Sequence, residues 1–315
     1  MKNLTSTYSA FNLHLSNSRL KPYQLTFDVT NDHELMGAYL WSQQVAGTLY
    51  PLFHFIEIFA RNAIDKVAKK RFGDYWWDTF DYDHSDKTCK KFIKNIKDAE
   101  KNLRISWENA ERDKLGLSYP DPIPTPYPIF SHDQIIAATE FSAWTFILTN
   151  GFFKPAGSSS TKYLWPSSLG NVFPQYNKLS PNPVDALKHL HDHLTDIRKY
   201  RNRVFHHEPI WIKGNTHKLT SIRAIQTIRQ KITKMENFIE FLGKRLHREF
   251  IETNLINNAK RVCSLQDLYI YQGKAKYVPF TAKQKRLLRK KFSSSQTETV
   301  CISYNDKVFG LSHII

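Results

Sequence analysis

The chain has 315 residues, of which 41% are apolar, and a formal net charge of +16. This length suits one large domain or two modest ones, and the apolar fraction is enough for a packed core, which argues against global disorder. The charge favours a polyanionic partner, such as RNA, DNA or an acidic membrane surface; the alternative is a basic protein that its charge keeps soluble.

The N-terminal segment and the cysteines indicate the compartment. The segment lacks the apolar region of a signal peptide, and the sequence contains no apolar run long enough to span a membrane. Cys89, Cys263 and Cys301 are odd in number and far apart, which speaks against a disulfide framework and against a CxxC zinc pair. We therefore expect a cytoplasmic protein without a membrane contact.

Hydrophobic periodicity predicts a mainly α fold. In the first half of the chain we expect helices at about 49–71, 85–112 and 134–149. Pro51 suits the first turn of the first of these helices, and Gly73 suits its end.

Two segments are predicted to be non-helical. Residues 118–128 read SYPDPIPTPYP, and each proline there removes a backbone donor and fixes φ. Residues 151–183 are rich in Gly, Ser, Asn and Pro and predict a long loop with short ordered pieces, a feature that is often functional in compact domains.

The second half of the chain predicts two clear helices and a basic tail. The helices cover about 184–205 and 219–248. Residues 244–291 contain 13 Lys or Arg against 3 Asp or Glu, a net charge of +10. Two apolar runs around Asn305 and Asp306 resemble a β-hairpin with a two-residue turn. We expect a helical domain at 1–250 and a basic C-terminal extension at 251–315.

The helix at 184–205 ends in the most informative segment, RNRVFHHEPI at 201–210. Its apolar stripe has a leucine or isoleucine at each helical step until Arg201 stands where leucine is expected. A buried guanidinium is costly unless it is paired or lines a cleft. Asn202 and His206 are four residues apart and share a face, and His206 lies where the helix ends. We expect a cation, an amide and an imidazole to converge there.

These groups suit RNA cleavage without a metal. A histidine can accept or donate the protons that move when the 2′-hydroxyl attacks the phosphorus. The fork of Arg201 matches the oxygens of a phosphorane, and Asn202 could orient His206 or the phosphate. DNA lacks the 2′-hydroxyl and would not be cut in this way. The structural alternative is a core arginine that is simply paired.

The segment at 201–206 resembles the Arg-x4-6-His motif of HEPN ribonucleases, and the longer string RNRVFHHEPI resembles the signature of Abi-like (abortive infection) bacterial proteins. Other segments agree with that family in order and spacing. They are SNSRLKPY (16–23), IEIFARNAID (56–65), FGDYWW (72–77), FSAWTFIL (141–148) and LWPSSLGNVFP (164–174).

The resemblance implies a HEPN-like helical bundle with endoribonuclease activity in phage defence or in a toxin–antitoxin system, with no cofactor. It further implies an RNA substrate, a homodimer with a composite site, and an antitoxin that is either a protein or a small structured RNA. Its catalytic residues would be Arg201, His206 and Asn202. The residues expected to bind RNA or to support the site are His207, Arg198, Arg203, Glu57, Arg61 and Asn62.

Glu57, Arg61 and Asp65 follow one another at intervals of four residues, which predicts a ladder of charges or a solvated salt-bridge face. Because Arg61 and Asn62 match the Arg-Asn pair of the family, we favour a supporting role for them. His191 and His193 are two residues apart, so a helix points them about 160° apart and a zinc site is disfavoured.

Four tryptophans are expected in the core rather than in base stacking: Trp76, Trp77, Trp144 and Trp165.

Two other functions remain open from the sequence. One is a non-catalytic RNA-binding defence module in which Arg201 and the tail grip phosphates. The other is a DNA-binding regulator that uses the basic tail, although no helix-turn-helix signature is present. A monomer with His207 or water as the second acid or base is the alternative to the homodimer.

Overall fold

A computed structural model describes residues 14–211 and 220–275, a few single residues beyond them, and two strands near the C-terminus. The chain divides into two compact units, Met1–Gly273 and Lys274–Ile315, and each is described by itself. The division falls later than the boundary expected at residue 250. No helix in the described part is long and apolar enough to cross a membrane.

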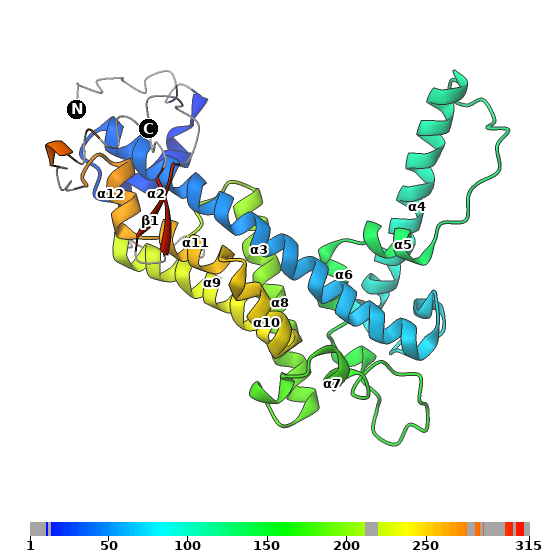
Figure 1. Cartoon of the computed structure of the whole chain (residues 1–315). Coiled ribbons are helices and arrows are strands. Elements are labelled where there is room, and N and C mark those ends of the chain that lie inside the picture. The colour runs from blue at the N-terminus through cyan, green and yellow to red at the C-terminus, as the bar shows by residue number, and fades with distance from the viewer. Residues whose placement is uncertain are drawn as a thin grey trace. The chain divides into compact units, whose positions relative to one another are not determined.

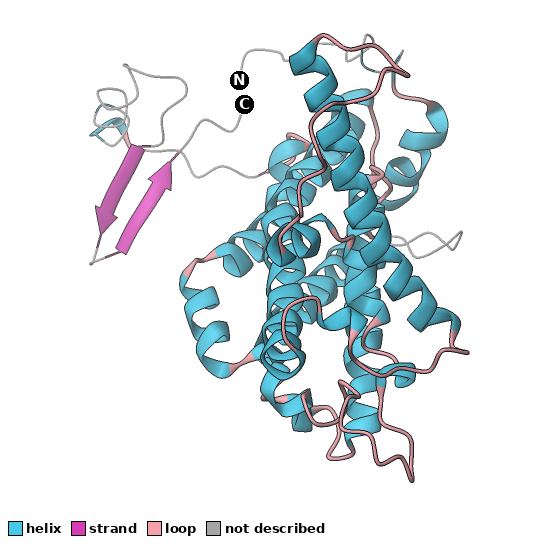
Figure 2. Ribbon diagram, turned by 90° about the vertical axis from the view of Figure 1, so that its right-hand side faces the viewer, coloured by secondary structure: helices cyan, strands magenta, loops and turns pink. Residues whose placement is uncertain are grey.

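The first unit is a bundle of helices, which confirms the mainly α prediction (Figures 1 and 2). Its central element is α3 (Asp32–Phe72), along which most other helices of this unit pack. The side chain of Asn31 caps its start by accepting a hydrogen bond from the Glu34 amide at 3.0 Å. Its end is Gly73, whose φ of 88° confirms the predicted stop.

The predicted start of this helix, at residue 49, is wrong. The helix begins 17 residues earlier, at Asp32, and Pro51 lies inside it. Met36, Trp41 and Val45 are buried and continue the apolar stripe across the proline. Gly47 is exposed, so the carbonyl that Pro51 leaves without an amide partner lies on the solvent side, which lowers the cost of the proline.

Two predicted helices are each divided in the structure. The helix expected at 134–149 forms α5 (His132–Ala138) and α6 (Phe141–Phe146), because Thr139 and Glu140 are extended. The helix expected at 219–248 forms α9 (Ser221–Leu242) and α10 (Lys244–Glu252), separated at Gly243 with a φ of 147°. Residues 212–219 lie outside the described part.

Among the remaining elements, the helices at 87–115 and 183–205 agree with the predictions, whereas the helices at 17–26, 255–262 and 265–271 were not predicted. The predicted loop contains only short pieces, and the four tryptophans expected in the core are buried. The elements are α2 (Asn17–Thr26), η1 (Trp76–Asp78), α4 (Lys87–Leu115), η2 (Asn150–Phe152), α7 (Leu169–Val172), η3 (Tyr176–Lys178), α8 (Pro183–Phe205), α11 (Leu255–Val262) and α12 (Leu265–Tyr271).

The last two helices, α11 and α12, belong to the bundle although the sequence placed them in the extension. Both pack against α3. The indole of Trp41 donates a hydrogen bond to the Val262 carbonyl at 2.9 Å, and the Gln272 amide donates one to the Phe27 carbonyl at 3.0 Å. The basic residues of α10 and α11 are therefore part of the surface of the first unit.

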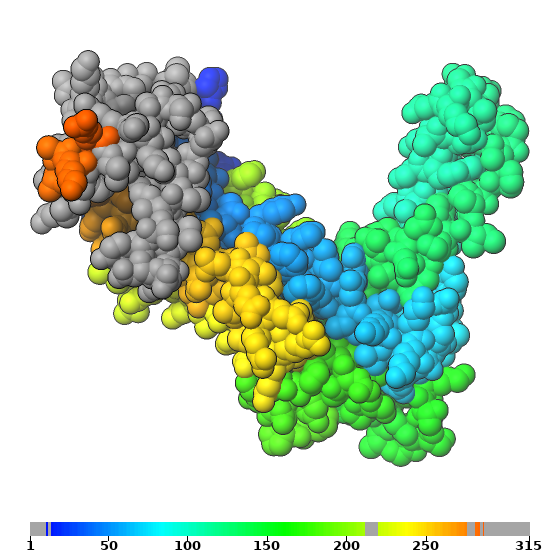
Figure 3. Space-filling view, in the orientation of Figure 1, coloured from blue at the N-terminus to red at the C-terminus, as the bar shows by residue number. Residues whose placement is uncertain are grey.

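The second half of α4 forms an arm with the segment that follows it. All buried residues of α4 lie in its first half. Beyond them, Thr125 donates a hydrogen bond to Glu111 at 2.8 Å, and Tyr127 lies 5.1 Å from Trp107, between ring centroids. Figure 3 shows this part of the chain standing clear of α3. The proline-rich segment at 118–128 contains no helix, as predicted.

In the second unit, β1 (Val300–Tyr304) and β2 (Lys307–Leu311) pair antiparallel, with Tyr304 opposite Lys307. This pairing agrees with the predicted hairpin. Its two turn residues, Asn305 and Asp306, lie outside the described residues. So do most of residues 283–292, a segment of the basic tail.

The close packing of α12 on α3 yields a test with an internal control. A Cβ at Gly37 would lie 2.2 Å from the backbone oxygen of Tyr271, whereas nothing lies within 4 Å of one at Gly47. We expect Gly37→Ala to lower the free energy of unfolding by about 1–3 kcal/mol through overpacking. Gly47→Ala should raise it by about 0.5–1 kcal/mol through helix propensity. Urea unfolding measures both, and effects of equal sign would contradict this packing.

Candidate active site

The candidate site lies at the C-terminal end of α8, where the chain reverses direction. The helix starts at the Asn182 cap, whose side chain accepts a hydrogen bond from Val184 at 2.9 Å, and its last residue is Phe205. After it, the His207 amide donates to the Val204 carbonyl and the Glu208 amide to the Arg203 carbonyl, both at 3.1 Å. These two bonds form a Schellman motif.

His207 occupies the position of this motif that favours glycine. Its φ is 56°, in the left-handed region that is costly for a residue with a Cβ. Arg19 of α2 stabilises this turn by donating a hydrogen bond from Nη1 to the His207 carbonyl at 2.7 Å. Two segments of the resemblance, 188 residues apart in sequence, thus meet in space.

The chain that leaves the turn is held by the same N-terminal helix. Trp211 is buried with its ring centroid 4.9 Å from that of Tyr23 and 4.6 Å from that of Phe27. Its indole donates a hydrogen bond to Thr26 at 3.2 Å. These contacts fix both sides of the turn, so His206 and His207 are presented on a supported backbone.

Arg201 lies within the buried stripe of α8, yet its contacts are loose. Its Nη2 is 3.9 Å from a carboxylate oxygen of Glu57 on α3, and its Nη1 donates to the Asn202 side chain at the long distance of 3.5 Å. Its guanidinium lies 4.8 Å from the ring centroid of Phe205, within the range of a cation–π contact. The side chain is 36% exposed, so solvent reaches it.

Glu57 has competing influences on its charge. Its burial raises the pKa of its carboxyl group, and the nearby charges of Arg201, Arg61 and His54 oppose this rise. Because the folded pKa lies above the ordinary value, this group costs stability as pH rises through that interval. The charged form of Glu57 is therefore favoured by Arg201, and Glu57 is the one carboxylate among the described residues that pairs with Arg201.

Arg71 serves as a comparison for Arg201, because its guanidinium has a structural role. Its guanidinium donates to the Leu164 carbonyl at 2.9 Å, to Ser168 at 2.6 Å and to the Thr161 carbonyl at 2.9 Å. In comparison, Arg201 makes one long hydrogen bond and one long ion contact with the residues that the structure describes. The difference leaves donor groups of Arg201 available for an anion.

The other predicted cations are distributed around Arg201. Arg198 lies one turn earlier, 5.6 Å from the ring centroid of Phe146, and its Nε is buried without a hydrogen-bond partner among the described residues. Arg61 donates to Asn62 at 3.3 Å and to the Ala137 carbonyl at 3.4 Å. Both therefore flank the candidate site on its α5–α6 side.

Three predicted residues are not brought together with Arg201. Arg203 points away from it and contacts the Pro209 carbonyl at 3.3 Å and Glu208 at 3.6 Å. His206 and His207 are exposed, and no hydrogen bond or ion pair joins either ring to Arg201 among the described residues. The expected convergence of the imidazole on the guanidinium stays a prediction.

The structure does not join the three charges of the predicted ladder by ion pairs. Asp65 instead accepts a hydrogen bond from Trp76 at 2.8 Å and lies 2.8 Å from His132 Nε2. Its burial raises the pKa of its carboxyl group. Asp65 therefore belongs to a buried structural cluster rather than to the candidate site.

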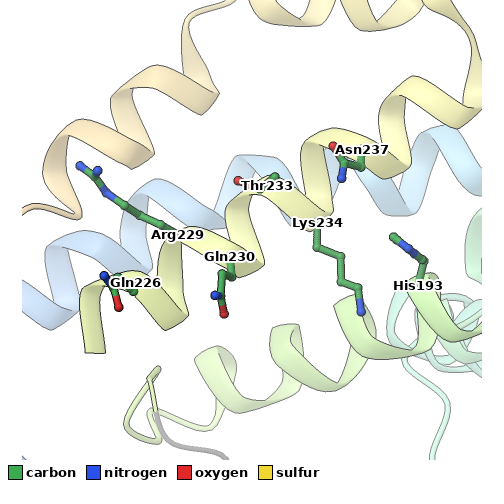
Figure 4. A pocket seen from close by; sticks show the side chains of 7 residues that line it. All are labelled: His193, Gln226, Arg229, Gln230, Thr233, Lys234 and Asn237. Carbon is green, nitrogen blue, oxygen red and sulfur yellow. The ribbon is translucent and has the colours of Figure 1, made fainter. Parts of the chain in front are cut away.

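A shallow groove of about 630 Å³ runs along α9 but does not include the candidate site. In Figure 4, Gln230 and Lys234 point toward α8, and Arg229 points away from it. The cations of this groove are already bound, Lys234 to Asp196 at 2.5 Å and Arg229 to the carbonyls of Cys263 and Lys260. By ideal helix geometry, Asp196 is about 140° around α8 from Arg201.

No group of three or more His, Cys, Asp or Glu side chains in the described chain is arranged to hold a metal ion. His191 contacts its neighbour Asp192 at 3.2 Å. His193 instead packs edge-on against Phe241, with a centroid distance of 5.4 Å.

Two exposed aromatic rings near Arg201 were not predicted from the sequence. Tyr50 and Phe205 lie 5.5 Å apart, between ring centroids, and both are exposed. An aromatic residue in a helical apolar pattern is usually predicted to lie in the buried core. For this reason the exposure of Tyr50 and Phe205 was not predicted. The sequence contained one indication of this patch, because Phe205 lies inside the Arg-x4-6-His segment at 201–206.

The left-handed backbone of His207 yields a test on two neighbouring histidines. We expect His207→Gly to raise the free energy of unfolding by about 1 kcal/mol, because glycine adopts this conformation without steric cost. His206 has a φ of −86°, so His206→Gly should lower the same quantity by about 0.5–1 kcal/mol. Urea unfolding compares the two variants, and a loss of stability in both would contradict the described turn.

Comparison with known proteins does not assign the chain to a family. No protein-family model, curated protein or solved structure matches it.

Proposed function

We propose that the chain is an endoribonuclease of the HEPN kind that acts without a metal, in anti-phage abortive infection or in a toxin–antitoxin system. The observation that carries the proposal is the environment of Arg201. A guanidinium in the apolar stripe of a core helix makes two long polar contacts within the described part of the chain, and its side chain remains 36% exposed. A cation held in this way is suited to bind a phosphate.

The proposed reaction needs a cation, a base and an acid. The RNA 2′-hydroxyl attacks the adjacent phosphorus while a histidine accepts its proton. The fork of Arg201 stabilises the charge that develops on the phosphorane oxygens. A second acid protonates the departing 5′-oxygen, which yields a 2′,3′-cyclic phosphate and a 5′-hydroxyl. His206 is the proposed acid or base, because its ring is exposed at the end of the same helix, with Asn202 beside Arg201.

A homodimer would supply the second acid or base. Each chain offers one His206 in this position, and a two-fold axis beside the end of α8 would bring two of them to one cleft. Interfaces of this kind use the same surface patch twice. We propose that the shared cleft contains both Arg201 guanidinium groups, whose mutual repulsion makes it attract anions.

In a cell such an enzyme needs restraint. We propose an antitoxin, either a neighbouring protein or a small structured RNA, that blocks the cleft until infection. Expression in a host with and without the native flanking DNA tests this point: toxicity without the flanking DNA and growth with it support a linked antitoxin.

The cleavage mechanism predicts the effect of two substitutions. Arg201→Ala and His206→Ala should each slow RNA cleavage by at least about a hundredfold, since each removes a group that acts in the transition state. Circular dichroism should show that both variants remain folded. The products of the unsubstituted enzyme should carry 2′,3′-cyclic phosphates, and EDTA should not change the rate.

Matched variants sharpen this test. Lys199→Ala removes an exposed charge from the same helix and should leave cleavage unchanged. His207→Ala separates the two histidines, because a monomer that uses His207 as its second acid or base would lose activity. Cleavage that EDTA abolishes and a divalent metal restores would refute the mechanism. Tight RNA binding without any cleavage would favour the non-catalytic RNA-binding module.

The shared cleft predicts how activity depends on subunit mixing. Light scattering should show a dimer. When unsubstituted and His206→Ala subunits are mixed in equal amounts and exchanged, activity should fall to about a quarter, because only dimers with two intact chains are active. A fall to about half would mean that each subunit cuts RNA independently.

A further inference from the structure

Two exposed aromatic rings from different helices form a patch beside Arg201. Tyr50 on α3 is 56% exposed and Phe205 on α8 is 41% exposed. Their ring centroids are 5.5 Å apart and their planes are tilted by 38°. The Arg201 guanidinium lies over the second ring, 4.8 Å from its centroid. One guanidinium therefore borders both the aromatic patch and the carboxylate of Glu57.

The patch is one end of a strip along α3 and α8. On α3, Tyr50, His54, Glu57 and Arg61 recur at intervals of four, three and four residues, which places them on one face. The two helices run antiparallel here, because Tyr50 contacts Phe205 while Glu57 contacts the earlier residue Arg201. The strip thus passes from aromatic rings at one end to guanidinium groups at the other.

We propose that Tyr50 and Phe205 form a stacking platform for one unpaired RNA base, next to the phosphate that Arg201 binds. This inference rests on the proposed ribonuclease function and adds what positions the substrate. Bases of single-stranded RNA stack on exposed aromatic side chains, while their phosphates need cations nearby. The strip provides both at neighbouring positions. Every base has a π face, so the platform selects unpaired RNA over duplex with little preference for the base.

The surroundings of the rings favour a base over a second protein chain as the occupant. A protein interface buries an apolar centre within a polar rim. Here the rings lie next to the partly exposed Arg201 and the exposed His54 and Asn202, so polar groups adjoin them closely. A base covers a ring with its own flat face and leaves these polar groups in contact with water and phosphate.

The test measures RNA binding without cleavage. The full chain carries His206→Ala, so that bound RNA stays intact, and fluorescence anisotropy follows a labelled single-stranded RNA of about ten nucleotides. A second probe of the same length lacks the bases of its central nucleotides. Phe205→Leu and Tyr50→Leu should each weaken binding of the intact RNA by about tenfold, and binding of the abasic probe by less than about twofold. Leucine retains apolar bulk and helix propensity.

Tyr119 supplies the matched control. It is 88% exposed and lies beneath Arg112, 5.6 Å from the guanidinium to the ring centroid, on the arm of α4. Tyr119→Leu should not change binding of either probe. Equal losses on both probes in the Phe205→Leu and Tyr50→Leu variants would show that the rings act through structure and would overturn the platform. Conversion of a dimer to a monomer by Phe205→Leu would show a subunit contact and would overturn it as well.

The outcomes also separate this proposal from the proposed function. If Arg201→Ala abolishes cleavage while both ring variants bind intact RNA normally, the ribonuclease stands and the platform fails. If the unsubstituted chain neither binds nor cuts RNA, both fail.

Discussion

The candidate site depends on one contact, between a guanidinium on α8 and a carboxylate on α3. Arg201 occupies a position that the helical stripe reserves for an apolar side chain, and Glu57 lies 3.9 Å away. Neither group suits burial alone: burial raises the pKa of Glu57, and Arg201 opposes that rise. An ion pair at this distance is weak. Glu57 therefore positions the guanidinium but leaves its hydrogen-bond donors available to another partner. An anion could therefore compete for it at modest cost.

The rest of the fold holds this pair at the end of a supported helix. The turn after α8 places His207 in a left-handed conformation, which persists only because the surroundings determine it. Arg19 binds the carbonyl of that residue, and Trp211 packs between Tyr23 and Phe27. Helix α2 therefore holds the turn after α8 in place. Through this contact the segment SNSRLKPY (16–23) lies beside the segment RNRVFHHEPI (201–210) in the fold.

The sequence predicted the types of most elements, because apolar periodicity and stop signals such as Gly73 act locally. It misplaced the start of α3 because Pro51 is usually a first-turn residue, and an exposed Gly47 carbonyl could not be foreseen. It did not foresee the breaks at Thr139 and Gly243, although glycine is a common residue at helix ends. For the site, the sequence identified Arg201 from its conflict with the stripe. It missed Tyr50 and Phe205, because only the antiparallel packing of α3 and α8 brings them together.

The central claim is that Arg201 is the anion receptor of this fold. Side-chain NMR of the arginines during titration with a 2′,3′-cyclic nucleoside monophosphate, the product type of the proposed reaction, tests it most directly. We expect the guanidinium signals of Arg201 to shift and to saturate. Those of Arg71 should stay in place, because its donors are bound to Leu164, Ser168 and Thr161. If the Arg201 signals do not shift, or if the signals of both arginines shift equally, Arg201 is not the anion receptor.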